Sequence, residues 1–225
     1  MIIDMNIFEF VFFISCFPLW FLTLIAFNKF SSTFEIAKNA NHFLHALVFV
    51  CLYRLETYLQ LKYLILLSIG FYSYDFLYIL YQVIAKKENM TKHLPFLIHH
   101  IIADYGLFLA YTDYMRSHIL YLYYLLEFSN FMLYTSYYVS KRWSNYKNLQ
   151  LVSFSFQFIW YSYFRVIRYS IYMYKIWSTF MLVSTYIQIA NSILFLMGFF
   201  WSYKLFRKCL KELKVVDICE KVKSN

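Results

Sequence analysis

Long apolar stretches separated by short polar segments run along the whole sequence. Seven of them approach or exceed the roughly 20 residues that a helix needs to cross the hydrocarbon core of a bilayer. They lie at residues 5–27, 42–59, 63–84, 96–112, 118–139, 149–174 and 178–203. This pattern predicts an all-α integral membrane protein with about seven transmembrane helices. Six spanning helices with a peripheral first segment are the alternative.

Composition agrees with this architecture. Apolar residues make up 62% of the 225-residue chain and charged residues only 15%, whereas a soluble domain needs more polar surface to cover its core. The chain contains only three Gly and two Pro, so few helices are interrupted.

Basic residues alternate between the two sides of the predicted bundle. If the N-terminus is outside, fifteen of the 21 Lys and Arg fall in the first, third and fifth loops and the C-terminal tail. Cytosolic loops of membrane proteins are enriched in Lys and Arg, so we expect a cytosolic C-terminus. The net charge of +9 then predicts contact of the tail with the anionic cytosolic leaflet rather than with nucleic acid.

The chain ends in KVKSN, with Lys221 and Lys223 fifth and third from the end. On a cytosolic tail this pattern is read by the coat proteins that return membrane proteins to the endoplasmic reticulum, and such a signal is an address rather than an anchor. We therefore expect a multi-pass protein of the endoplasmic reticulum membrane, or of a host membrane if the chain is viral.

Ionisable and amide side chains interrupt the apolar stretches at regular spacing. Each ionisable group at the bilayer centre costs roughly 2.5–3.5 kcal/mol, so such groups usually face the protein interior, have a partner or serve a function. Residues three or four positions apart share a helix face, and five pairs follow this rule: His42 with His45, His100 with Asp104, Glu127 with Asn130, Arg165 with Arg168, and Gln188 with Asn191. Together with Asp75, these stripes predict a polar interior inside an apolar shell.

Depth along the helices separates two groups of these residues. At 1.5 Å per residue, Asp75 lies roughly 13 Å from the cytosolic end of its helix. His99, His100, Asp75 and Glu127 are expected to converge in the cytosolic half of the membrane, with Arg165 nearer the centre or the lumenal half. These four form the candidate catalytic set, and His45, Asp104, Asn130, Arg165 and Asn191 are expected to line a cavity or bind lipid. Interhelical hydrogen bonding without further function is the alternative for each residue taken singly.

Four segments carry most of these residues in one order: NHFLHALVF, SIGFYSYDFLYIL, LPFLIHHIIADYGLFLAY and YYLLEFSNFMLY. WYSYFRVIRYSIY and QIANSILF follow as weaker matches. In this order they resemble the TLC-domain family, which includes translocating-chain-associating proteins, ceramide synthases and a ceroid-lipofuscinosis protein. The resemblance implies a six-helix TLC core around a central cavity over residues 39–211, preceded by a helix and loop at 1–38 and followed by a basic cytosolic tail at 212–225.

The resemblance also implies residence in the endoplasmic reticulum and work on lipids. In ceramide synthases paired histidines, matched here by His99 and His100, lie where acyl-CoA acylates a sphingoid amine. The further His-Asp motif of those enzymes is absent, because the corresponding stretch reads YLYYLLEFSNFML. The expected function is therefore lipid homeostasis or lipid binding and sensing, closer to the small TLC-domain proteins. A synthase-like N-acyltransferase using acyl-CoA and a cargo receptor of the endoplasmic reticulum are the alternatives.

No metal or cofactor is expected, apart from acyl-CoA as a substrate if the protein is an enzyme. A membrane di-iron hydroxylase needs about eight clustered histidine ligands, and the six histidines of this chain are scattered.

Overall fold

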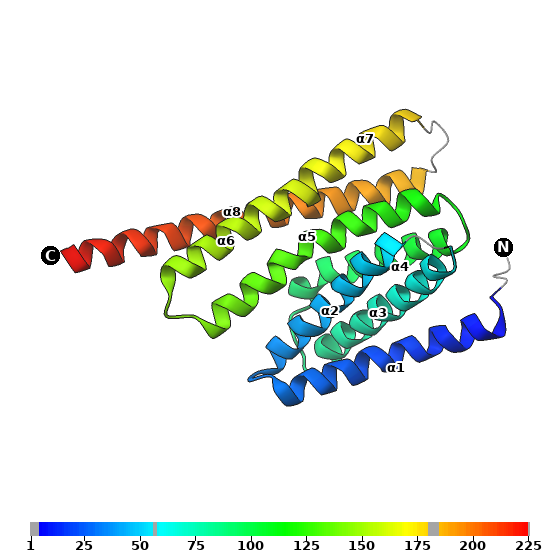
Figure 1. Ribbon diagram of the computed structural model, residues 1–225, viewed down its shortest axis with the longest axis horizontal. Coiled ribbons are helices and arrows are strands. Elements are labelled where there is room, and N and C mark those ends of the chain that lie inside the picture. Colours follow the sequence, from blue (N-terminus) through cyan, green and yellow to red (C-terminus); the bar gives the residue numbers. More distant parts are fainter. Residues whose placement is uncertain (1–4, 56–57, 180–184, 225) are drawn as a thin grey trace. The chain divides into compact units, whose positions relative to one another are not determined.

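The computed structural model describes residues 5–55, 58–179 and 185–224, with side chains at 5–55, 61–178 and 185–214, and its regular structure there is entirely helical. The elements are α1 (Ile7–Phe30), α2 (Phe34–Leu55), α3 (Tyr58–Ala85), α4 (Met90–Tyr111), α5 (Arg116–Arg142), α6 (Lys147–Ser162), η1 (Tyr163–Arg168), α7 (Tyr169–Thr179) and α8 (Thr185–Ser224) (Figure 1). The π-helical segment η1 joins α6 to α7 without a break. The described chain therefore forms the seven helical rods that the sequence predicts.

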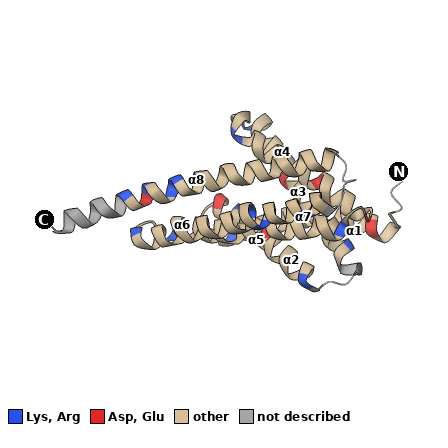
Figure 2. Ribbon diagram, turned by 90° about the horizontal axis from the view of Figure 1, so that it is seen from above, with Lys and Arg blue, Asp and Glu red and all other residues tan. Residues whose placement is uncertain are grey.

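Two helix ends differ most from the prediction. α2 begins at Phe34, earlier than the expected residue 42, and α8 continues to Ser224, beyond the expected residue 203. Hydropathy falls where charged residues begin, but a helix continues as long as its backbone hydrogen bonds do. The part of α8 beyond residue 203 holds all of its Lys and Arg, and Figure 2 shows basic residues toward its C-terminal part. The side chains of Lys221 and Lys223, the predicted coat-protein signal, lie outside the described residues.

Four helices within the described residues are long and apolar enough to cross a membrane: α1, the Leu61–Ala85 part of α3, α4, and the Thr185–Lys214 part of α8. The other rods do not meet both criteria, and in the last of them η1 divides the rod into helices of only 16 and 11 residues. In α5 the reason is composition, because its 27 residues include six tyrosines, whose hydroxyl groups lower the hydropathy of an otherwise large apolar side chain. Membrane crossing by α2, α5 and α6–α7 stays a prediction.

The chain divides into two compact units, Met1–Tyr124 and Leu125–Asn225, with the boundary inside α5. In the first unit α3 packs against α1, α2 and α4, and α1 also packs against α2 (Figure 1). The backbones of α1 and α3 approach closely at Gly70, where an added Cβ would lie 2.7 Å from Cys16 Cβ. Beside this crossing the Trp20 indole donates a hydrogen bond to the Leu67 carbonyl at 3.1 Å.

A buried ion pair connects three helices of the first unit near the start of α1. Asn6 and Glu9 form a capping box there. The Glu9 carboxylate also lies 2.5 Å from Lys62 Nζ of α3 and accepts a 2.8 Å hydrogen bond from the Tyr111 hydroxyl of α4. Glu9 is only 4% exposed. One side chain thus caps its own helix and fixes two neighbouring helices.

In the second unit α8 packs along α6, η1 and α7. The Trp160 indole donates to the Phe128 carbonyl at 2.8 Å, which attaches α6 to the second half of α5. Hydroxyl groups link α6 to α8 through Ser162 and Ser202, whose oxygens are 2.5 Å apart.

Candidate functional site

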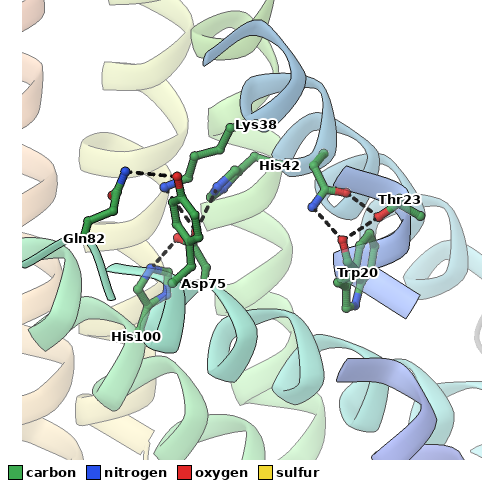
Figure 3. A network of polar contacts seen from close by, with 9 residues as sticks. Trp20, Thr23, Lys38, His42, Asp75, Gln82 and His100 are labelled. Atoms are coloured by element: carbon green, nitrogen blue, oxygen red, sulfur yellow. Dashed lines mark hydrogen bonds and ion pairs between the residues drawn. The ribbon is translucent and has the colours of Figure 1, made fainter. Parts of the chain in front are cut away.

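The buried carboxylate of Asp75 joins basic side chains from two other helices of the first unit. Its Oδ1 lies 3.3 Å from Lys38 Nζ and 3.4 Å from His42 Nε2, both on α2, and its Oδ2 lies 3.0 Å from His100 Nε2 on α4. Figure 3 shows Asp75 between Lys38 and His42 on one side and His100 on the other. We call these four residues the Asp75 centre.

Local sequence places each member of the Asp75 centre on an inward helix face. Lys38 and His42 are four residues apart and therefore neighbours on one face of α2. This face exists only because α2 begins at Phe34, so that Lys38 lies within the helix rather than in a loop. The exposed fraction falls from 29% for the Lys38 side chain and 20% for His42 to 6% for His100 and 3% for Asp75. The centre therefore extends from the interior toward the surface along α2.

Aromatic rings surround the histidines of this unit. The His45 ring is stacked on Phe71 with centroids 4.0 Å apart, and its Nε2 lies 3.2 Å from the Ser68 hydroxyl. The Tyr72 ring contacts both His99 and His100, at centroid distances of 6.1 and 5.5 Å. His45 is thus bonded and packed within the core, whereas His99 is half-buried beside Tyr72.

Asp104 and His100 both face α3, as their spacing of four residues predicts. The Asp104 carboxylate accepts a 3.2 Å hydrogen bond from the Ser73 hydroxyl. Its other oxygen, Oδ1, is buried without a hydrogen-bond partner among the described residues. Asp104 therefore lies beside the Asp75 centre along α3 and α4 but makes separate contacts.

The other predicted site residues belong to the second unit. Glu127 is buried and Asn130 is half-buried on α5. Asn191 of α8 accepts a 2.9 Å hydrogen bond from the Tyr169 hydroxyl, and Arg165 is buried within η1. Of the four predicted catalytic residues, the structure brings Asp75 and His100 into direct contact and places the His99 ring 5.5 Å from that of His100. The meeting of Glu127 with these residues, and the central cavity, stay predictions.

The contact between Asp75 and His100 suits proton transfer. A neutral His100 that donates through Nε2 to the carboxylate keeps its lone pair on Nδ1, which is the arrangement of a general base oriented by a carboxylate. His100 Nδ1 is buried and has no hydrogen-bond partner among the described residues. Among the residues that the structure describes, no group of three or more His, Cys, Asp and Glu side chains is arranged as a metal site.

Two residues of the buried polar contacts, one in the Asp75 centre and one in helix packing, were missing from the sequence-based set. Lys38 precedes the apolar stretch at residues 42–59 and so belongs to the predicted first loop, although its four-residue spacing from His42 is the signal of a shared face. Glu9 lies in the first turn of an apolar helix, and its partners Lys62 and Tyr111 are distant in sequence. No local pattern indicates such a pairing.

The family model of the TLC domain matches residues 4–207, which include α1 and most of the chain. Comparison with curated proteins and with solved structures returned no significant match. The matched residues contain all four helices that are long and apolar enough to span a membrane, at least in part. The chain therefore belongs to the TLC-domain family of multi-pass membrane proteins.

Proposed function

We propose that this protein binds a membrane lipid at the Asp75 centre and acts in lipid homeostasis. The observation that carries the proposal is one buried carboxylate held by three basic side chains from two other helices, inside a membrane domain. Ionisable groups within membrane-spanning segments are costly and typically mark functional sites. A purely structural ion pair needs a single partner, and Asp75 has three.

The graded exposure of the centre fits a lipid headgroup. Lys38 and His42 are partly exposed, while His100 and Asp75 are buried. A polar headgroup that enters along α2 meets the donors of Lys38 and His42 first. The aromatic side chains of Phe71 and Tyr72 pack against the histidines and form an apolar wall behind the polar groups.

Lipid profiles of cells test this function. We expect loss of the protein to change the abundance of at least one lipid class, and re-expression of the wild type to restore it. The Lys38→Met/His42→Gln variant should fail to restore it, because the Lys38 ammonium and the His42 imidazole are gone while the contact between Asp75 and His100 remains. Lys29→Met, at an exposed lysine in the last turn of α1, is the matched control and should restore the profile.

An unchanged lipid profile upon loss of the protein would contradict the proposal and favour the role of a cargo receptor. Full restoration by Lys38→Met/His42→Gln would show that the partly exposed side of the Asp75 centre does not bind the lipid.

A second candidate function is N-acyl transfer, which the orientation of His100 by Asp75 favours. In this reaction His100 Nδ1 accepts the proton of a substrate amine as the nitrogen attacks the thioester carbonyl of acyl-CoA. The amide C–N bond forms, the C–S bond breaks, and the proton passes from the imidazolium to the leaving CoA thiolate. Asp75 holds the imidazole in the required tautomer and stabilises the imidazolium.

Release of CoA by purified protein with acyl-CoA and a sphingoid base tests this candidate. The expected result for His100→Ala is a loss of about 10²–10⁴-fold in rate, the usual contribution of a general base. His99→Ala should also lower the rate if the paired histidines share the reaction chamber. His93→Ala is the matched control, because the His93 ring pairs with exposed Glu88 and not with the Asp75 centre. This variant should retain the wild-type rate. CoA release that survives both substitutions, or no release from the wild type, would exclude acyl transfer.

A further inference from the structure

The guanidinium of Arg165 is deeply buried in the second unit. The residue is 2% exposed and lies in η1, between α6 and α7. Its Nη1 makes one long hydrogen bond, 3.4 Å, to the Leu126 carbonyl, and the guanidinium lies 5.8 Å from the Tyr161 ring centroid and 6.0 Å from that of Trp201. The immediate surroundings of the charge are therefore one carbonyl oxygen and two aromatic rings.

This set of contacts leaves the donors of Arg165 largely unused. A guanidinium carries five N–H donors and no acceptor, and a buried one is normally paired with a carboxylate. Arg165 forms no ion pair with a carboxylate of the described residues, and its Nε is buried without a hydrogen-bond partner among them. The hydroxyl of Tyr161 is also buried and likewise has no hydrogen-bond partner in the described part of the chain.

The backbone, rather than a charge partner, fixes the position of Arg165. A π-helical segment is rare and frequently occurs at functional sites, because it displaces side chains from their α-helical positions. The stem of Arg165 lies against Gly198 of α8, where an added Cβ would be 2.8 Å from Arg165 Cγ. Glycine at 198 thus makes room for the stem, and η1 holds an uncompensated positive charge in an apolar setting.

We propose that Arg165 and Tyr161 form a binding site for an anionic oxygen group carried by a lipid, either a carboxylate or a phosphate. The planar fork of a guanidinium matches both groups and bonds them through two N–H donors. The Tyr161 hydroxyl supplies a further donor, and exclusion of water strengthens each bond. This site goes beyond the proposed function, which concerns the Asp75 centre of the first unit.

Thermal unfolding of the purified full-length protein in neutral detergent tests the site. The probes are oleate for a carboxylate, dioleoyl phosphatidic acid for a phosphate, and dioleoylglycerol as the uncharged lipid. At 100-fold excess over Kd, a ligand of the native state should raise the Tm of the wild type by roughly 5 °C or more. We expect this rise with oleate or phosphatidic acid and none with dioleoylglycerol, and the effective probe identifies the group. An equal rise with inorganic phosphate alone, or with dioleoylglycerol, would overturn the proposal.

Substitutions separate this site from a structural role of Arg165. Arg165→Met should abolish the acidic-lipid shift while its Tm without lipid stays at or above that of the wild type, because an unpaired buried charge is removed. Arg168→Gln alters an exposed arginine of the same segment and should keep the shift. Tyr161→Phe, which keeps the ring, should weaken acidic-lipid binding by about tenfold and provides the test if Arg165→Met does not fold.

The opposite pattern, a lower Tm for Arg165→Met with an undiminished acidic-lipid shift, would assign Arg165 to packing alone. A full shift in Tyr161→Phe would remove the hydroxyl from the site. Lys38→Met/His42→Gln should retain the acidic-lipid shift, so that failure of the Arg165 site and failure of the Asp75 centre give different results.

Discussion

Replacement of Asp75 by Ala is expected to lower the free energy of unfolding by about 3–5 kcal/mol, because it leaves buried His100 and partly exposed Lys38 and His42 without the carboxylate that they share. His100 is almost as buried as Asp75 and loses its carboxylate partner, and Lys38 and His42 lose theirs at the same time. Thermal unfolding of the purified protein measures the effect. At about 2–4 °C per kcal/mol for a chain of this size, Tm should fall by roughly 10 °C.

Two variants show whether the loss at Asp75 is electrostatic. Adding Lys38→Met to Asp75→Ala should recover part of the lost stability, because one of the uncompensated charges is removed. Asp104→Ala removes a half-buried carboxylate of the neighbouring helix whose hydrogen bond comes from Ser73, and should cost less. A Tm of Asp75→Ala within 1 °C of the wild type, on the order of the effect of a surface substitution, would show that the centre contributes little to stability.

A comparable loss, about 3–5 kcal/mol, is expected when Glu9 is replaced by Ala. The substitution removes the counter-charge 2.5 Å from Lys62 Nζ, the acceptor of the Tyr111 hydroxyl and half of the capping box that begins α1. Three helices lose a common contact at once. Chemical or thermal unfolding in detergent measures the change.

The control for Glu9 is Glu35→Ala, at an exposed acidic residue in the first turn of α2, which should change stability by less than about 0.5 kcal/mol. In the double variant Glu9→Ala/Lys62→Met, the loss should be smaller than the sum of the two single losses, because neither charge is left unpaired. Additive losses would mean that Glu9 acts through the helix cap and not through Lys62.

The stability role of Asp75 also determines which variants can report on function. A variant that unfolds cannot separate lipid binding from folding, so Asp75→Ala is unsuited to lipid profiling. Lys38 and His42 share one carboxylate oxygen and are partly exposed, so their removal leaves the 3.0 Å contact between Asp75 and His100 in place. A change in lipid profile in Lys38→Met/His42→Gln therefore reports on the exposed side of the centre.

The sequence by itself determined the class of protein, the seven helical rods and the family, because these depend on hydropathy and on the local order of motifs. It also determined which residues share a helix face, since that depends on a spacing of three or four residues: His100 and Asp104 do face the same helix. The ends of helices that carry charged residues were less predictable. The helix α2 begins before its apolar stretch and α8 continues beyond its own, because charge ends an apolar stretch without ending a helix.

Only the tertiary structure decided which face meets which. The apolar stretch around Asp75 predicts that its carboxylate faces the protein interior, but the pairing with Lys38, His42 and His100 depends on how α2, α3 and α4 are rotated and packed against one another. Glu9 and Tyr111 are 102 residues apart in sequence, and the stem of Arg165 lies against Gly198 of another helix. Such contacts result from helix packing, which is cooperative across the whole unit and leaves no signature in any one segment.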